Sequence, residues 1–597
     1  MPLTLTSLPY EAEVGDQAAA RSRLGVRDEK HSTLALERHV YRPRRPPVLS
    51  GSFVVTRCSE ALPAAGNDEK IAALFPHMHR KPLVRIGFHS GPQPVPVGRP
   101  LRVGVLFSGG PASGGHNVLT GLYEYLATRN VSSSLLGFLG GPSGLLDDKH
   151  IEIDEMLLFK HRNQGGFHLL GSGRTKIETA EQLEVAFRNC EKLELDGLVI
   201  VGGDDSNTNA CLLGEYIAEH RGRTCVVGVP KTIDGDLRNE YIEASFGFDT
   251  ACKTYAELVS NLGFDASSAQ KVYHICRLMG RSASHITLEV ALQTHPNVAI
   301  ISEEVAAKRQ TLPMIVNIIA DTVCERAQMG KNYGLVILPE GIVEFMPDIR
   351  ALIAELNEVL SAPNTSNVGA AATGNGMAAA AAEAAAAADT KSEATIVKEI
   401  AAMLSDKSAT LLLSLPVPFA AQLCLDRDPH GNVQVSKIES ERLIAELVDR
   451  ELQRRKHERT YCGTFSTVTH FFGYEGRCGL PSNFDCNYCY TLGLVAGGLI
   501  EHGYTGYMAR ATGLCRAPEL WEVGGVPLTS MMNIERRKGK DVPVIEKSTV
   551  NLGGAVFQSY KSVRHAWRLS DDYRVVGPMQ FYGPHADEIT RTIETTE

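Results

Sequence analysis

The sequence predicts an α/β protein with two Rossmann-like domains, in which mostly parallel sheets flank a cleft. Short apolar runs alternate with helical patterns from Leu101 to about residue 340, which is typical of a parallel sheet with right-handed crossovers. Loops rich in Gly, Asp, Ser and Thr follow two of these runs, and open α/β sheets bind ligands at the carboxyl ends of their strands. A chain of 597 residues is also too long for one compact core, so at least two domains are expected.

The predicted elements follow one another along the chain. Strands are expected from short apolar runs, and helices from apolar residues at helical spacing. In order, they are a strand at 103–107, a helix from about Gly115, strands at 198–201, 225–229 and 272–278, a helix at 284–292, a strand at 297–301, a helix at 313–326 and a strand at 333–338. A later helix is predicted from Tyr488, Leu492, Val495 and Leu499.

These elements suggest four parts of the chain: an N-terminal extension (1–100), a first α/β domain (101–262 plus 480–530), a second α/β domain (263–479) and a C-terminal segment (531–597). The extension has little periodicity, so we expect it to wrap on the surface or on a partner subunit. Its basic, proline-rich patch at 41–47 is interpreted as an exposed solvated segment rather than a nuclear-localisation or membrane signal. The Ala-rich stretch at 361–392 is expected to be a surface insertion without chemistry, since it has no apolar face to bury.

The composition disfavours several classes of function. The 60 basic and 69 acidic residues give a net charge of −9, which is unusual for a general nucleic-acid binder. No apolar stretch is long enough to span a membrane. The 13 scattered cysteines and the lack of a signal peptide favour a reducing, cytoplasmic location. Cys486 and Cys489 have a metal-ligand spacing, but no second pair follows, so a zinc site is disfavoured.

Two adjacent carboxylates follow the predicted strand at 198–201. Asp204 and Asp205 stand in the run Gly-Gly-Asp-Asp-Ser-Asn-Thr-Asn-Ala, where they could cap a helix. Adjacent like charges are costly unless a cation joins them. Because Mg²⁺ usually takes one or two carboxylates together with substrate phosphate oxygens, these residues are candidate magnesium ligands.

A lysine and two acids follow the next strand, at 225–229. Lys231 and Asp234 lie three positions apart in the run Lys-Thr-Ile-Asp-Gly-Asp, which could also be a plain turn. A lysine neutralises a phosphate, and a nearby carboxylate can act as a general base. This combination suits phosphoryl transfer.

Three further loops carry weaker signals. The first, from Ser108 to Gly115, follows a strand and precedes a helix, so its glycines would let a phosphate approach backbone N–H groups. It lacks the spacing of a Walker A loop and of a dinucleotide site. The other two are Met279-Gly280-Arg281 and Tyr474-Glu475-Gly476-Arg477, whose arginines could bind a sugar phosphate or form exposed salt bridges.

Together these motifs resemble the phosphofructokinase family, and within it the pyrophosphate-dependent enzymes of the long type. Gly-Gly-Asp-Asp, Pro-Lys-Thr-Ile-Asp-Gly-Asp, Met-Gly-Arg, Pro-Glu-Gly and Tyr-Glu-Gly-Arg occur in the family's order, and the resemblance covers about residues 101–345 and 465–515. It implies reversible phosphoryl transfer from pyrophosphate to fructose 6-phosphate, giving fructose 1,6-bisphosphate and phosphate. The first domain would hold pyrophosphate and Mg²⁺, and the second the sugar phosphate.

The resemblance also implies individual roles at the phosphoryl-transfer site. Asp204 would hold Mg²⁺. Asp205 would select the donor, because ATP-using relatives usually have glycine there. Lys231 would bind pyrophosphate and steady the transferring phosphoryl group, while Asp234 would take the proton from the sugar 1-hydroxyl. Gly110 would contact pyrophosphate.

Other matching residues would serve the substrates. Arg174 would bridge pyrophosphate and the sugar phosphate. Lys271 would reach the site of a neighbouring subunit, which implies a homodimer or homotetramer with shared sites. The implied sugar-phosphate residues are Thr232, Ile233, Asp234, Lys271, Met279, Gly280, Arg281, Glu340, Tyr474 and Arg477. The glycine loop departs from the family pattern, because Pro111 replaces Gln and Ser113 replaces Pro; we expect altered loop stiffness and pyrophosphate affinity.

Three alternatives remain. An ATP-dependent 6-phosphofructokinase would share the fold, but a carboxylate at Asp205 would repel the α-phosphate of a nucleotide. A regulatory subunit of a pyrophosphate-dependent hetero-oligomer would be expected to lose Asp204 or Asp234, and both are present. A nicotinamide oxidoreductase is disfavoured by the glycine spacing.

Overall fold

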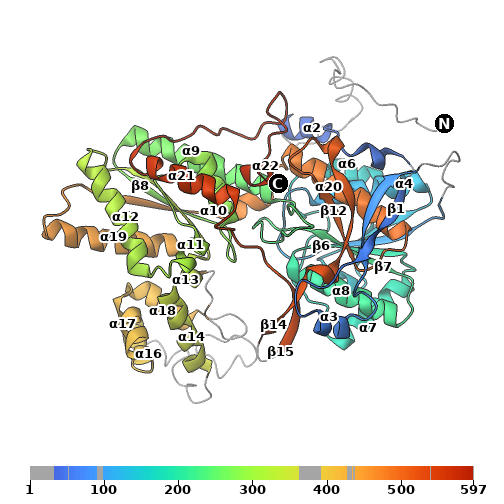
Figure 1. Ribbon diagram of the computed structural model, residues 1–597, viewed down its shortest axis with the longest axis horizontal. Coiled ribbons are helices and arrows are strands. Elements are labelled where there is room, and N and C mark those ends of the chain that lie inside the picture. Colours follow the sequence, from blue (N-terminus) through green and yellow to red (C-terminus); the bar gives the residue numbers. More distant parts are fainter. Residues whose placement is uncertain are drawn as a thin grey trace.

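The structure is a computed structural model that describes residues 33–595, apart from 52, 90–97, 362–391, 427–432, 434–436 and 538–539. Its strands form a nine-stranded sheet, a four-stranded sheet and a two-stranded hairpin. The two larger sheets lie at opposite ends of the long axis (Figure 1). Strands β6 (Gly197–Gly202), β7 (Cys225–Pro230) and β12 (Tyr507–Thr512) lie on the right, and β8 (Tyr273–Leu278) lies on the left. The predicted α/β fold class with mostly parallel sheets is confirmed.

The nine-stranded sheet has a parallel centre and antiparallel edges. Its order is β1-β2-β13-β12-β7-β6-β3-β4-β5, and the strands from β12 to β4 pair in parallel. The strands are β1 (Phe53–Ala61), β2 (Pro82–Phe88), β3 (Arg102–Phe107), β4 (Ser134–Phe138), β5 (His150–Glu152), β6 (Gly197–Gly202), β7 (Cys225–Pro230), β12 (Tyr507–Thr512) and β13 (Glu522–Pro527). All residues of β6 are buried, as expected for an apolar central strand.

Two helices beside the nine-stranded sheet pack closely against each other at glycine residues. Helix α4 (Gly115–Arg129) packs against α20 (Asn483–Glu501), and a Cβ on Gly121 would lie 2.2 Å from the carbonyl oxygen of Tyr490. The predicted helix around Tyr488–Leu499 is α20. The other helices here are α2 (Thr33–His39), α3 (Asp68–Leu74), α5 (Pro142–Leu146), α6 (Glu155–His161), α7 (Ala180–Lys192) and α8 (Asp204–Glu219).

The four-stranded sheet is parallel throughout, in the order β11-β8-β10-β9. Its strands are β8 (Tyr273–Leu278), β9 (Val298–Ala299), β10 (Gly334–Pro339) and β11 (Thr467–Phe472). The helices around it are α9 (Phe248–Ala269), α10 (His285–Thr294), α11 (Ser302–Ala307), α12 (Leu312–Gln328), α13 (Ile342–Phe345), α14 (Pro347–Ser361), α16 (Glu393–Ala401), α17 (Asp406–Ser414), α18 (Val417–Leu425) and α19 (Ser440–His457). The predicted strand at 297–301 shortens to two residues, and the alanine run at 378–388 lies outside the described residues.

The N-terminal part differs from the expected irregular extension. Strands β1 and β2 pair antiparallel, and β2 joins β13, so this part adds two strands to the sheet. Strand β1 is an edge strand with several exposed residues, so its sequence shows little apolar alternation. The basic patch is also held by hydrogen bonds rather than merely solvated. The Tyr41 hydroxyl and the Arg44 N–H both donate to Asn487 Oδ1 at 2.8 Å, and the Arg44 side chain contacts Glu519 at 2.7 and 2.8 Å on the surface. These partners are distant in sequence, which explains why local patterns do not reveal the contacts.

The C-terminal segment passes between the two halves. It begins with the hairpin β14 (Met532–Arg537) and β15 (Lys540–Ile545) and ends with α21 (Ala555–Leu569) and α22 (Arg591–Glu594). Between hairpin and helix, the Ser548 N–H donates to the Asp236 carbonyl at 2.7 Å, and the Val550 N–H donates to Glu303 at 2.9 Å. In the described part of the chain, no helix has the length and apolarity that a membrane crossing requires.

Candidate active site

Two carboxylate-bearing loops emerge side by side from the centre of the large sheet. Strands β6 and β7 are parallel neighbours, and their last residues, Gly202 and Pro230, pair with each other. Asp204 begins α8 with only Gly203 between it and β6, and Lys231 directly follows β7. The Lys231 N–H donates to the Gly202 carbonyl at 3.0 Å, which joins the two loops.

The glycine-rich loop after β3 lies against this pair. Gly109 has a φ of +86°, which favours glycine, and a Cβ there would lie 3.3 Å from Lys231 Nζ. A Cβ on Gly110 would lie 3.5 Å from the Arg477 guanidinium carbon. Because both glycines lack side chains, the backbone of the loop stays open towards two cations, which is an arrangement suited to a phosphate.

The turn that carries Asp234 is fixed by its own side chains. The Thr232 hydroxyl accepts a hydrogen bond from the Asp234 N–H at 3.1 Å and donates to Asp236 at 2.9 Å. Gly235 has a φ of +72°, so the chain reverses sharply between the two aspartates. Lys231 and Ile233 are buried, whereas Thr232 and Asp234 remain partly accessible. The turn therefore presents the Asp234 carboxylate beside a buried lysine.

The surroundings move the pKa values of Asp234 and Lys231 towards neutrality. Burial, together with the negative charges of Asp236 and Glu340, raises the pKa of Asp234 to about 7. Burial lowers the pKa of Lys231 to about 8, an effect that Asp234 partly offsets. A carboxylate and an ammonium that both titrate near neutral pH in one site are typical of catalytic groups.

One cation of the site was not predicted from the sequence. Lys547, in the segment after β15, places its Nζ 3.5 Å from Asp204 Oδ2 and 3.6 Å from Asp236 Oδ2. It also donates to the Ser282 hydroxyl at 3.2 Å. Burial alone would lower the pKa of Lys547, but the carboxylates of Asp204 and Asp236 outweigh it and raise the pKa. No local motif marks this lysine, since all three partners lie more than 260 positions away in the sequence.

Six of the predicted sugar-phosphate residues lie at the carboxyl ends of the small sheet. Met279, Gly280 and Arg281 follow β8, Glu340 follows β10, and Tyr474 and Arg477 follow β11. These strands are parallel neighbours, so their loops share one edge, and the Glu340 N–H donates to the Leu278 carbonyl at 2.8 Å. The guanidinium of Arg477 lies 4.7 Å from the centre of the Tyr474 ring. Burial raises the pKa of Glu340, against the charges of Arg277 and Arg281.

Three predicted residues lie at the rim or away from this cluster. Asp205 is exposed in the first turn of α8, beside Asp204. Arg174 is exposed, but it follows Gly173, whose carbonyl accepts from the Gly109 N–H at 2.8 Å. Lys271 is exposed at the amino end of β8, so about 26 Å of extended chain separates it from Met279 in the same subunit.

The carboxylates present suit a metal that is shared with a substrate. Among the described residues, no group of three or more His, Cys, Asp or Glu is arranged to hold a metal ion by itself. Asp204 and Asp236 nevertheless converge on one cationic atom, Lys547 Nζ, within 3.6 Å. A Mg²⁺ ion that takes one or two carboxylates and completes its shell with phosphate oxygens and water fits this donor set.

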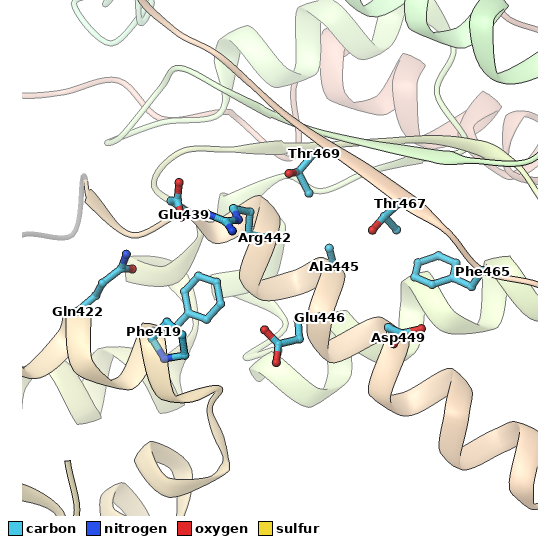
Figure 2. Close-up of a pocket in the computed structure, with 11 residues that line it drawn as sticks. Phe419, Gln422, Glu439, Arg442, Ala445, Glu446, Asp449, Phe465, Thr467 and Thr469 are labelled. Carbon is cyan, nitrogen blue, oxygen red and sulfur yellow. Dashed lines mark hydrogen bonds and ion pairs between the residues drawn. The ribbon is translucent and has the colours of Figure 1, made fainter. Parts of the chain in front are cut away.

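A separate cavity lies away from all of these residues. It has a volume of about 500 Å³ and lies between α18, α19 and the edge strand β11. Figure 2 shows Glu446 and Phe419 on its helical walls and Thr467 and Thr469 on the strand. Its lining includes none of the residues predicted for the active site, so the active site is identified by its loops and charges rather than by cavity size.

The chain is similar in sequence to several known proteins. A sequence model of the family described as Phosphofructokinase matches residues 102–500. The chain is 46% identical over 549 residues to "Pyrophosphate--fructose 6-phosphate 1-phosphotransferase subunit beta 1" of Arabidopsis thaliana, covering 92% of this chain and 91% of the relative. It is 47% identical over 572 residues to "Pyrophosphate--fructose 6-phosphate 1-phosphotransferase" of Treponema pallidum, covering 94% and 96%. A solved pyrophosphate-dependent phosphofructokinase from Marinobacter aquaeolei aligns with 82% of this chain and 96% of its own, at 13% identity and a TM-score of 0.49.

Proposed function

The chain belongs to the phosphofructokinase family, and we propose that it catalyses the reversible transfer of a phosphoryl group from pyrophosphate to fructose 6-phosphate, giving fructose 1,6-bisphosphate and phosphate. Relatives with this named activity match the chain over more than nine-tenths of its length. The observation that carries the proposal is the turn after β7, which sets Asp234, with a pKa raised to about 7, beside the buried Lys231.

Asp234 acts as the general base in this proposal. Its raised pKa lets the carboxylate accept the proton of the 1-hydroxyl and return it in the reverse reaction, both near neutral pH. Lys231 neutralises charge on the transferring phosphoryl group, and the open backbone at Gly109 and Gly110 leaves room for pyrophosphate. Phosphoryl transfer depends mostly on positioning and charge stabilisation, and these residues supply both.

Asp204 holds Mg²⁺ in this proposal, and Asp236 lies nearby, since both carboxylates are within 3.6 Å of Lys547 Nζ. When bound, Mg²⁺ supplies positive charge to the phosphate oxygens of the donor. Asp205, in the next position of α8, selects the donor. Its carboxylate is exposed on the donor side, where it repels the additional phosphate of a nucleotide but leaves pyrophosphate unaffected.

The sugar phosphate binds at the carboxyl ends of β8, β10 and β11, opposite the donor. Arg281 and Arg477 provide charge for its 6-phosphate, and Glu340 faces the turn of Asp234 closely enough to influence that carboxyl. Thr232, Ile233, Met279, Gly280 and Tyr474 line the same loops, while Arg174 serves the pyrophosphate side. Lys271 serves the site of a second subunit, so the active species is at least a dimer.

A coupled assay tests this function. Purified chain alone is given fructose 6-phosphate and Mg²⁺ with either pyrophosphate or ATP, and formation of fructose 1,6-bisphosphate is followed. We expect turnover with pyrophosphate and a kcat/KM for ATP at least about 100-fold lower, which corresponds to one unfavourable charge contact of about 3 kcal/mol. Preference for ATP would contradict the donor assignment. Activity only after mixing with another subunit would assign the chain a regulatory role.

A further inference from the structure

Lys547 occupies a position that the roles above do not explain. It belongs to the C-terminal segment, yet its ammonium group reaches the proposed metal ligand Asp204, the buried Asp236 and the loop of the sugar-phosphate half at Ser282. It is thus the point at which three separate parts of the site meet. Its side chain remains 39% exposed.

The distances argue against a purely structural ion pair. A charge-assisted N–H···O bond is normally about 2.7–2.9 Å long, whereas Lys547 Nζ lies 3.5 and 3.6 Å from its two carboxylates. Elsewhere in the chain, Arg564 and Arg129 contact their glutamates at 2.6 and 2.7 Å. Lys547 is therefore held between two carboxylates without a short bond to either, and it keeps its donor capacity for another acceptor.

We propose that Lys547 is a pyrophosphate-binding residue, whose ammonium contacts phosphate oxygens of the donor together with Lys231. This inference rests on the proposed function. The charges of Asp204 and Asp236 act on both lysines. Lys231 also lies against the glycine loop, and Lys547 Nζ lies within 3.6 Å of both carboxylates. A polyanion that enters a pocket with so many carboxylates needs more than one fixed cation, and Lys547 supplies the second.

When the charge of Lys547 is removed, the proposal predicts opposite changes in the affinities for pyrophosphate and for a divalent cation. Pyrophosphate loses a direct cationic contact, so its affinity falls. A divalent cation no longer competes with an ammonium beside Asp204 and Asp236, so its affinity in the absence of pyrophosphate rises. A residue that merely held the C-terminal segment in place would weaken both ligands or neither.

The experiment compares wild type with Lys547→Met, which keeps the length of the side chain and removes its charge. Sodium pyrophosphate binding is measured by calorimetry with EDTA present, and Mn²⁺ binding to substrate-free protein by electron paramagnetic resonance. We expect pyrophosphate to bind about 10- to 100-fold more weakly, the loss typical of one charged hydrogen bond. We expect Mn²⁺ to bind at least about threefold more tightly, and the KM for fructose 6-phosphate to stay within about twofold.

Two further variants complete the test. Lys561→Met removes an exposed lysine on α21 in the same segment and should leave all three constants unchanged. Lys547→Arg keeps the charge and should recover most of the pyrophosphate affinity; Lys547→Gln replaces the Met variant if that one fails to fold. Unchanged pyrophosphate affinity in an active Lys547→Met enzyme, or parallel loss of both ligands, overturns the inference. Wild type that does not use pyrophosphate would instead refute the proposed function.

Discussion

Replacement of Asp234 by asparagine should inactivate the protein and stabilise it. The folded structure raises the pKa of this carboxyl from its ordinary value of 3.8 to about 7, chiefly by burial. Between these two values the unfolded chain has lost the proton and the folded chain retains it. The contribution of Asp234 to stability is thus complete below about pH 3.8 and is lost progressively as the pH rises to about 7.

The size of this effect follows from the shift. One pKa unit corresponds to about 1.36 kcal/mol, so the two units between pH 5 and 7 correspond to about 2.7 kcal/mol. Because Asp234 is partly accessible and lies near Lys547, relaxation reduces this value, and we expect roughly 1–3 kcal/mol. Asparagine cannot ionise, so the advantage of Asp234→Asn over wild type should grow by this amount between about pH 5 and pH 8.

Two measurements check the prediction on the same protein. Thermal unfolding without substrate or metal should show a gain in Tm that is larger at about pH 8 than at pH 5, and the coupled assay should show turnover reduced by about 10²–10⁴, as for loss of a general base. Glu304→Gln is the control. Arg564 and Lys308 overcome the effect of burial and lower the pKa of Glu304 to about 2, so this carboxylate stays ionised at both pH values. The Glu304→Gln variant should therefore lose nearly the same stability at pH 5 and at pH 8. A Tm difference for Asp234→Asn that does not change with pH, or near-normal turnover, would refute the reasoning.

Three other predictions follow from the same site. The ratio of kcat/KM for ATP to that for pyrophosphate should rise in Asp205→Gly and rise further, but not additively, when Lys231→Gly is added; an unchanged ratio would remove the donor role of Asp205. The kcat/KM should depend on pH as a bell-shaped curve, which falls below about pH 7 as Asp234 gains a proton and above about pH 8 as Lys231 loses one. Asp236→Asn should move the acid limb of this curve to lower pH, because it removes a negative charge near Asp234. Mixing Lys271→Ala with Asp234→Asn chains should restore some activity through hybrid sites, and a fully active monomer would exclude this sharing.

The sequence predicted those parts of the site in which a functional side chain directly follows an apolar strand. Asp204 and Lys231 each follow an apolar strand, and neighbouring parallel strands place their carboxyl ends at one edge, so their proximity follows from the pattern alone. Strand β1 was not foreseen, because an edge strand that is largely exposed carries little apolar alternation. The Arg44–Glu519 contact was not foreseen either, since it joins residues 475 positions apart.

Lys547 shows why the remaining part of the site could not be predicted. A lysine between a glutamate and a serine has no local feature that separates it from a surface lysine. Its position depends on the hairpin β14–β15, on the backbone bond from Ser548 to Asp236, and on the anchoring of Val550 to Glu303. These contacts carry the C-terminal segment past both halves of the active site before α21 packs beside α10 and α12. Because the segment is fixed on each side of Lys547, the ammonium is positioned by the fold as a whole, and its charge can act on pyrophosphate only when both halves are assembled.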